Sequence, residues 1–290
     1  MTLDQLRIFV GVAEREHMTR AAEALHVTQS AASAAIAALE TQHGVKLFHR
    51  VGRRIELTDA GRAFLDEARA VLGRAASAEL ALSEFAGLQR GTLRLVASQT
   101  IVNYWLPRHL AAFRARFPLI AVDLAIANTE LAIQRVTAGT AELGFIEGSI
   151  DDDAIAHWVV AHDRLVLVGT EPLVQIDNAW LSNARWIMRE SGSGTRSTFE
   201  EALRSRGLDP DTIDIALTLP SNESVRTAVE AGAGVAVLSA LVVARALSTG
   251  VLHTLPFELP ARPFFALCHK ERYRSKVADA LLNLIKESTP

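Results

Sequence analysis

The sequence has little cysteine and no long apolar run. Cys268 is the only cysteine among 290 residues, so the chain cannot form an internal disulfide. The surrounding letters FFALC predict that this thiol lies in a buried strand. No apolar stretch approaches the ~18 residues that a membrane-spanning helix needs, and the N-terminus lacks the apolar core of a signal peptide. These absences predict a cytoplasmic protein without a membrane partner.

The sequence also lacks the residue patterns of metal sites and of common enzymes. Its nine histidines show no zinc-type spacing with cysteine or carboxylate, and we expect His157 and His162 to be solvated. GAGVAV at 232–237 lies between an expected helix and an expected strand, the reverse of a dinucleotide fingerprint, so Gly232 is interpreted as a helix C-cap. SGSGT at 191–195 lacks the first glycine of a nucleophile elbow. We predict no catalytic residue, no metal and no cofactor.

Charge is distributed unevenly along the chain. The formal net charge is −3, which by itself argues against a nucleic-acid partner. Residues 41–54, however, carry no acidic side chain. Their basic groups and imidazoles are Lys46, Arg50, Arg53, Arg54, His43 and His49. A short basic segment in an otherwise slightly acidic chain is typical of a small module that binds a polyanion and is attached to a larger body with another task.

The first sixty residues have the periodicity of three helices and a hairpin. Apolar residues at helical spacing predict a first helix with Thr2 as its N-cap. They are Leu3, Leu6, Phe9, Val10 and Ala13. Further helices are predicted at about 18–25 and 28–39, the latter capped by Thr28. VKLFHRVGRRIELT then predicts short extended segments around Gly52, with arginines near the hairpin tip.

The second and third of these helices have the spacing of a helix-turn-helix, whose second helix enters the major groove of DNA. Alanines at 31, 32, 34, 35, 37 and 38 would let that helix pack closely and lie deep in a groove. Polar side chains near its start would reach bases or phosphates. They are Thr28, Gln29, Ser30 and Ser33. A plain helical hairpin is the alternative, and the adjacent basic hairpin counts against it.

A heptad repeat begins after residue 58. Thr58-Asp59 is a cap signal, and apolar residues then follow at alternating intervals of four and three. They are Phe64, Ala68, Val71, Ala75, Ala78, Leu82 and Phe85. We interpret residues 59–88 as a linker helix that pairs two subunits in a coiled coil. One long helix lying on its own domain is the alternative.

Strands and helices alternate after Gly91, which predicts parallel sheets covered on both faces. Two sets of about 100 residues each, the second starting near RLVLVGT, predict two lobes with a cleft between them. Lobe 1 would comprise about 89–162 and 268–290, and lobe 2 about 163–267. The predicted domains are therefore a DNA-binding domain at 1–58, a linker helix at 59–88 and an effector-binding domain at 89–290.

Three expected helix starts in the last domain follow strands and carry hydroxyl groups. They are ASQT at 97–100, SGSGTR at 191–196 and PSNES at 220–224. Unpaired N–H groups and the positive end of the helix dipole would let these starts hold a small anion. Ligands of doubly wound folds bind beyond the carboxyl ends of the strands, where these starts lie. Ordinary capping by Ser98, Ser193 and Ser221 is the alternative at any single start.

The stretch LDQLRIFVGVAEREHMTRAAEALHVTQSAASAAIAALETQHGVKLFHRVGRRIELTDAG resembles the winged helix-turn-helix of LysR-type transcriptional regulators, and the likeness extends over essentially the whole chain. The resemblance implies a multidomain protein: an all-α winged helix-turn-helix, a long linker helix and a two-lobed α/β effector domain like a periplasmic binding protein. It implies a homodimer or homotetramer that binds double-stranded promoter DNA, contacts RNA polymerase and responds to a small, anionic effector.

Carried over by position, the resemblance implies roles for individual residues. Thr28, Gln29, Ser30 and Ser33 would face DNA, with Arg53 and Arg54 on phosphates. Alanines at 34, 35 and 37 replace the long polar side chains of many members, so DNA shape would supply more of the specificity. The effector-binding residues would be Ser98, Thr100, Asn128, Glu147, Ser193, Thr195 and Asn222.

TIVNYWLP, GFIEG and SGSGTR are similar to a subgroup associated with sulfur oxyanions such as sulfite. Pro220-Ser221-Asn222 departs from the Gly-Asn-Ser that this subgroup often has. Glu147 is unexpected in an anion site and would bond a protonated or amino-bearing group, or face solvent.

Two other classes of protein remain as alternatives. One is a solute-binding protein with an unrelated helical extension, against which the missing export signal and the basic segment 41–54 argue. The other is a ligand-binding enzyme, for which the sequence shows no nucleophile–base pair.

Overall fold

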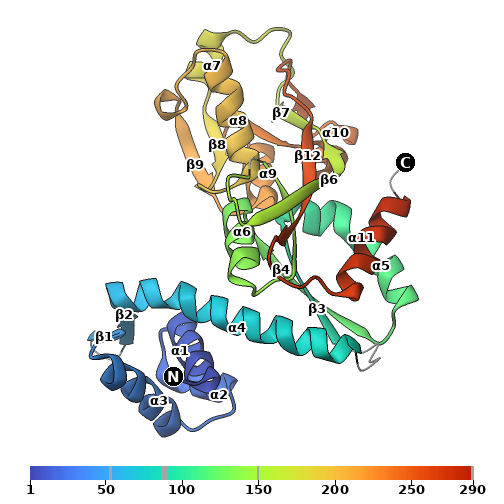
Figure 1. Ribbon diagram of the computed structural model, residues 1–290. Helices are drawn as coiled ribbons and strands as arrows, with labels where there is room; N and C mark the ends of the chain where they lie inside the picture. Colours follow the sequence, from blue (N-terminus) through green and yellow to red (C-terminus); the bar gives the residue numbers. More distant parts are fainter. Residues whose placement is uncertain (52–53, 86–90, 149, 289–290) are drawn as a thin grey trace. The chain divides into compact units, whose positions relative to one another are not determined.

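The computed structural model describes residues 1–51, 54–85, 91–148 and 150–288, which form two compact units (Figure 1). The N-terminal unit contains helices and a β-hairpin. Its elements are α1 (Leu3–Arg15), α2 (Met18–Ala24), α3 (Gln29–His43), β1 (Phe48–Val51), β2 (Arg54–Leu57) and α4 (Asp59–Phe85).

The core of the N-terminal unit forms on the predicted apolar face of α1. Leu6 and Phe9 are buried, and the Phe9 ring contacts the rings of Phe48 and Phe64 at centroid distances of 5.5 and 4.9 Å. The predicted cap is confirmed as a full capping box, in which Gln5 N donates to Thr2 Oγ1 and Thr2 N donates to Gln5 Oε1. Local sequence therefore specifies this helix.

The helix-turn-helix is formed by α2 and α3, with a tight turn between them. His26 takes a left-handed backbone, φ 55°, and Thr28 caps α3 as predicted. The helix runs to His43 rather than to residue 39, because the residues after Leu39 continue the helix until Gly44 ends it with φ 66°.

The long helix α4 starts at the predicted cap. Thr58 Oγ1 accepts a hydrogen bond from Gly61 N at 2.9 Å and donates one to the Lys46 carbonyl at 2.7 Å. Phe64 and Ala68, at the start of the heptad seam, pack in the core of the N-terminal unit. Farther along, the Val71 and Leu82 side chains are 41% and 73% exposed. Among the seam side chains that the structure describes, Phe64 and Ala68 are therefore packed in their own unit, whereas Val71 and Leu82 are exposed.

The second unit consists of two lobes. Lobe 1 has a five-stranded sheet of order β4-β3-β5-β12-β6. Its elements are β3 (Gly91–Ser98), η1 (Ile101–Trp105, a π-helix), α5 (Leu106–Arg116), β4 (Ile120–Ala127), α6 (Thr129–Ala138), β5 (Leu143–Glu147), β6 (Ile155–Asp163), β12 (Arg262–His269) and α11 (Lys276–Ser288). α5 and α11 cover one face of the sheet and α6 covers the other.

Lobe 2 contains a three-stranded sheet, β10-β7-β11, and a parallel pair, β8-β9. Its elements are β7 (Leu165–Gly169), α7 (Asn178–Asn183), β8 (Trp186–Arg189), α8 (Gly194–Ser205), η2 (Pro210–Thr212), β9 (Ile215–Leu219), α9 (Asn222–Glu230), β10 (Ala236–Ser239), α10 (Ala240–Ser248) and β11 (His253–Thr254). Trp186, Phe199 and Leu203 are among the fully buried side chains of its core.

Two expectations about this unit need correction. The lobe 1 sheet is mixed rather than parallel, because β12 pairs antiparallel with both β5 and β6. The three-stranded sheet of lobe 2 is antiparallel, because β7 pairs antiparallel with β10 and β11. The return to lobe 1 comes at Arg262 rather than at residue 268, because all of β12 pairs within the lobe 1 sheet. Cys268 is buried in β12, as predicted.

Candidate DNA interface and effector site

The predicted DNA-facing residues lie at the start of α3. Thr28, Gln29 and Ser30 are exposed, and Ser33 is half-buried. The Thr28 hydroxyl is already engaged, since it accepts from Ala31 N at 3.1 Å and lies 3.0 Å from Ser30 Oγ. The exposed Gln29 amide is thus the longest polar group at this edge of the helix.

The alanines of α3 divide between two faces. Ala32 is fully buried beside Ile36 and Leu39, which hold the helix on its unit, whereas Ala34 and Ala37 are exposed. An exposed face of small side chains next to polar groups is the shape that a DNA groove accepts.

The hairpin beside α3 is the predicted wing. β1 and β2 pair antiparallel, with Phe48 opposite Leu57 and Val51 opposite Arg54. The Arg53 prediction lies outside the described residues, and for Arg54 the structure describes the backbone alone. The wing arginines therefore remain a prediction.

Glu40 ties the wing to α3. Its Oε1 accepts from Leu47 N at 2.9 Å and from Phe48 N at 3.3 Å, while Oε2 accepts from Lys46 Nζ at 2.6 Å. Burial alone raises the pKa of Glu40, but the hydrogen bonds from Lys46 and from the two backbone groups outweigh it and lower this pKa below its usual value. The buried carboxylate stays ionised and fixes the hairpin against the end of α3.

The predicted effector residues lie where lobe 1 and lobe 2 meet. Ser98 and Glu147 end the neighbouring strands β3 and β5, both are buried, and Ser98 Oγ donates to Glu147 Oε2. Thr195 lies in the first turn of α8. Asn222 starts α9, and its Nδ2 donates to Thr100 Oγ1 at 3.0 Å. Five of the seven predicted residues are thus brought together.

The other two predicted residues have different surroundings. Asn128 caps α6 by accepting from Leu131 N at 3.0 Å, and its Nδ2 donates to the Ser191 carbonyl at 3.3 Å. Ser193 is buried at the N-cap of α8, but its hydroxyl makes no capping bond. Three serines, Ser98, Ser193 and Ser221, were the candidates for ordinary helix capping. Only Ser221 makes such a bond, because its hydroxyl accepts from Ser224 N at 3.0 Å.

A pair of buried ions that sequence reasoning missed occupies the centre of this site. The Arg262 guanidinium donates from Nε and Nη2 to Asp163 Oδ2 at 2.9 and 2.8 Å. Its Nη1 donates to Thr195 Oγ1 at 3.0 Å, and its Nη2 lies 3.5 Å from Thr100 Oγ1. The available signal was one charged residue at one end of each strand, Asp163 at the end of β6 and Arg262 at the start of β12.

A second buried arginine lies beside this pair. Arg189 Nη1 donates to Asn222 Oδ1 at 2.5 Å, and its Nε and Nη2 donate to the two carboxylate oxygens of Glu190 at 2.8 Å. Glu147 and Asp163 therefore face Arg262, while Arg189 is paired with Glu190.

Further contacts hold the lobes together around the site. Gln99 Nε2 donates to the Pro220 carbonyl and Gln99 Oε1 accepts from Asn222 N, both at 2.9 Å. Tyr104 Oη donates to Glu223 Oε1 at 3.1 Å. Burial and the negative charge of Glu223 raise the pKa of Tyr104, so the phenol keeps its proton. These hydrogen bonds join described polar side chains of lobe 1 to lobe 2 around the predicted site.

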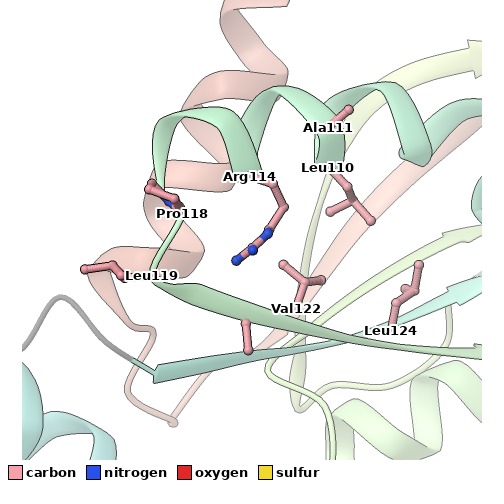
Figure 2. A pocket seen from close by; sticks show the side chains of 8 residues that line it. Leu110, Ala111, Arg114, Pro118, Leu119, Val122 and Leu124 are labelled. Atoms are coloured by element: carbon pink, nitrogen blue, oxygen red, sulfur yellow. The ribbon is translucent and has the colours of Figure 1, made fainter.

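A separate pocket of about 730 Å³ lies between α5 and β4 (Figure 2). Its lining is apolar except for Arg114, which donates to the Ile120 carbonyl. None of the predicted effector residues lines it.

Within the described ranges, no group of three or more His, Cys, Asp or Glu side chains could hold a metal ion. A search of the described helices for a long, apolar, membrane-crossing segment finds none.

Comparison with known proteins gives matches over the whole chain. Residues 3–62 match the family described as "Bacterial regulatory helix-turn-helix protein, lysR family", and residues 86–290 match "LysR substrate binding domain". The chain is 33% identical over 289 residues to a probable RuBisCO transcriptional regulator of Nostoc sp., an alignment that covers 96% of this chain and 86% of the relative.

Solved structures share the fold. Full-length CbnR complexed with its target DNA matches with a TM-score of 0.68 and 24% identity, over 100% of both chains. The CcmR regulatory domain of Synechocystis PCC6803 in complex with 2-PG matches with a TM-score of 0.60 and 22% identity, over 69% of this chain and 98% of that domain.

Proposed function

Since this chain belongs to the LysR family of DNA-binding transcriptional regulators, we propose that it binds double-stranded promoter DNA through the start of α3 and the β1–β2 hairpin. The observation that carries the proposal is the exposed edge Thr28-Gln29-Ser30 of a capped helix, which is followed in the chain by the basic segment 41–54. The family match over residues 3–62 favours this function over a solute-binding protein with a helical extension.

Gel shifts with DNA from upstream of the chain's own gene test the DNA-binding proposal. We expect binding that weakens steeply as salt rises, because the basic hairpin would displace counterions from phosphates. A DNA of the same length and scrambled sequence is the control. Equal affinity for both DNAs, or affinity independent of salt, contradicts the proposal.

We propose further that the effector is a small anion bound at the carboxyl edge of β3 and β5. Two observations support this site. Hydroxyl and amide groups from both lobes converge there, and the starts of α8 and α9 bring the positive ends of their helix dipoles. The related CcmR domain has been solved with 2-PG. Because hydrogen bonds from Gln99 join the two lobes around this site, a ligand bound there would favour one arrangement of the effector domains.

Thermal unfolding with sodium sulfite, sodium sulfate, sodium phosphate and 2-PG tests the effector class. A ligand at about one hundred times its Kd stabilises by ~2.7 kcal/mol, which raises Tm by about 5–10 °C for a domain of this size. The Ser98→Ala/Thr195→Ala double variant should lose the shift, whereas Ser205→Ala, on the exposed end of α8, should keep it. A shift that survives the double variant moves the site elsewhere.

The exposed part of α4 supports a third proposal, that two chains pair through this helix. The apolar side chains of Val71 and Leu82 follow the heptad seam and are left uncovered by the chain's own unit. A homodimer, or a homotetramer built from it, would place two DNA-binding units on one operator. We further propose that the regulator contacts RNA polymerase at the promoter and that it is located in the cytoplasm.

A further inference from the structure

An anion in the cleft needs a full positive charge, and the seven predicted effector residues supply none. The starts of α8 and α9 contribute partial charges only. Arg262 lies among these residues with its side chain 3% exposed, and it is the first residue of β12. Because a buried charge is costly unless it is paired, each hydrogen bond of this guanidinium bears on what the cleft can bind.

The hydrogen bonds of Arg262 fall into two groups. Along one edge, Nε and Nη2 hold Asp163 Oδ2 at 2.9 and 2.8 Å, in an ion pair buried on both sides. Along the other, Nη1 donates to the neutral hydroxyl of Thr195 at 3.0 Å and Nη2 lies 3.5 Å from that of Thr100. A hydroxyl oxygen is a weaker hydrogen-bond acceptor than the oxygen of an anion. The hydrogen bonds of this second edge would therefore become stronger if an anion replaced the two hydroxyls.

We propose that Arg262 is the effector-binding cation of this cleft. The N–H groups that now bond Thr195 and Thr100 bond the anion when it enters, while Asp163 keeps the rest of the guanidinium in place. The inference rests on the proposed function, since it assigns the charged partner of the anion at that same site.

The position of Arg262 also links binding to the arrangement of the lobes. Asp163 is the last residue of β6 and Arg262 the first of β12, and the two face each other in register where the chain leaves lobe 1 and returns to it. Asp163 Oδ1 further accepts from Ser239 Oγ, the N-cap of α10 in lobe 2, at 2.7 Å. A displacement of the guanidinium therefore acts on both connections between the lobes.

Substitution of Glu147 should change the affinity for an anion in the opposite direction to substitution of Arg262. Its Oε1 lies 3.6 Å from Arg262 Nη1, so this carboxylate competes with an anion for the same N–H group. Glu147→Gln keeps the shape of the side chain and removes the competing charge. It should tighten anion binding, whereas loss of the Arg262 guanidinium should weaken it.

Isothermal titration calorimetry on the full chain tests the inference, with whichever of sodium sulfite, sodium sulfate, sodium phosphate or 2-PG stabilises the wild type. Arg262→Lys should weaken binding about 10- to 100-fold, because an ammonium cannot hold Asp163 at two points and still reach the anion. Glu147→Gln should tighten binding. Arg274→Lys, which alters another ion-paired arginine of lobe 1, is the matched control and should change affinity less than about twofold.

A second variant distinguishes loss of anion binding from loss of folding. Arg262→Gln/Asp163→Asn removes both buried charges together, so no lone ion remains. It should unfold cooperatively and bind no anion. Wild-type affinity in either Arg262→Lys or the double variant overturns the inference, as does unchanged or weaker binding by Glu147→Gln.

The outcomes separate this inference from the proposed function. If no anion stabilises the wild type, the anionic effector itself is wrong and the inference falls with it. If an anion binds the wild type and Ser98→Ala/Thr195→Ala abolishes binding, but Arg262→Lys does not weaken it, the site stands and the role of Arg262 alone is wrong.

Discussion

At the scale of single residues, Glu40 shows how one carboxylate joins two parts of the proposed DNA interface. It lies near the end of α3, yet its partners are the side chain of Lys46 and the backbone at Leu47 and Phe48, where the hairpin begins. The position of the wing relative to α3 thus depends on a buried ion with three hydrogen bonds. Loss of the Glu40 carboxylate would leave the backbone N–H groups of Leu47 and Phe48 without their acceptor.

Glu40→Gln should lower the free energy of unfolding of the N-terminal unit by ~1–3 kcal/mol at pH 7, because the amide has one acceptor oxygen where the carboxylate has two. The folded pKa of Glu40 is lowered, so its contribution is complete above the unfolded pKa of about 4.3 and is lost as pH falls below that value. Urea unfolding of both proteins at several pH values measures the difference, which should shrink towards acid pH. A constant difference contradicts the ionic role.

Gln29 and Arg53 are predicted to differ in what they contribute to DNA binding. Gln29→Ala should relax preference at one base position by ~1–3 kcal/mol, whereas Arg53→Ala should weaken binding to every sequence and reduce the salt slope by about one. Gel shifts over a set of single-base operator variants distinguish them, with Thr41→Ala, near the other end of α3, as the control. The same sequence-independent effect for both variants would mean that the assigned roles are wrong.

At the scale of elements, the start of α8 is packed directly against β5. A Cβ on Gly194 would meet the carbonyl oxygen of Glu147 and would lie 2.6 Å from Thr129 Oγ1. Thr129 Oγ1 itself donates to that carbonyl at 2.8 Å. Glycine is therefore required here by close approach, and a larger residue at the start of α8 would clash with the end of β5.

Gly194→Ala should lower the free energy of unfolding by ~1–3 kcal/mol, because the added methyl group overpacks the contact between α8 and β5. It should also open the cleft, which small-angle X-ray scattering would detect as a larger radius of gyration. Gly91→Ala is the matched control, since a Cβ there meets nothing within 4 Å. An unchanged Tm and radius in Gly194→Ala would contradict the close packing.

The helices of this chain could be predicted from sequence because their causes are local. The caps Thr2, Thr28 and Thr58 lie within a few residues of the groups they bond. The Arg262–Asp163 pair could not, because its members are 99 residues apart and meet through strand pairing. The antiparallel direction of β12 has the same origin, since apolar periodicity carries no strand direction.

At the scale of the whole molecule, α4 is the element through which one chain would meet another. Its seam is filled at Phe64 and Ala68 and open at Val71 and Leu82. Two copies pairing along the open part would bury these side chains and hold two copies of α3 at a fixed spacing.

Val71→Glu/Leu82→Glu should convert the dimer to a monomer and weaken operator binding by about 10²-fold or more, because each half-site is then bound alone. Light scattering coupled to size-exclusion chromatography measures the mass, and gel shifts measure the affinity. Val174→Glu, at a 99% exposed position of the second unit, is the control and should leave both unchanged. A dimer that persists in the double variant places the subunit contact elsewhere.

The internal hydrogen bonds of the predicted effector site have a consequence for dose response. Because Thr100, Thr195 and Arg262 are already satisfied by the chain itself, the effector competes with an internal ligand that is always present at high local concentration. The apparent affinity is then the intrinsic affinity multiplied by the fraction of molecules in which these groups are free of their internal partners. Substitutions that remove the hydrogen bonds of Gln99 or Tyr104 between the lobes should therefore lower the effector concentration at which the regulator responds.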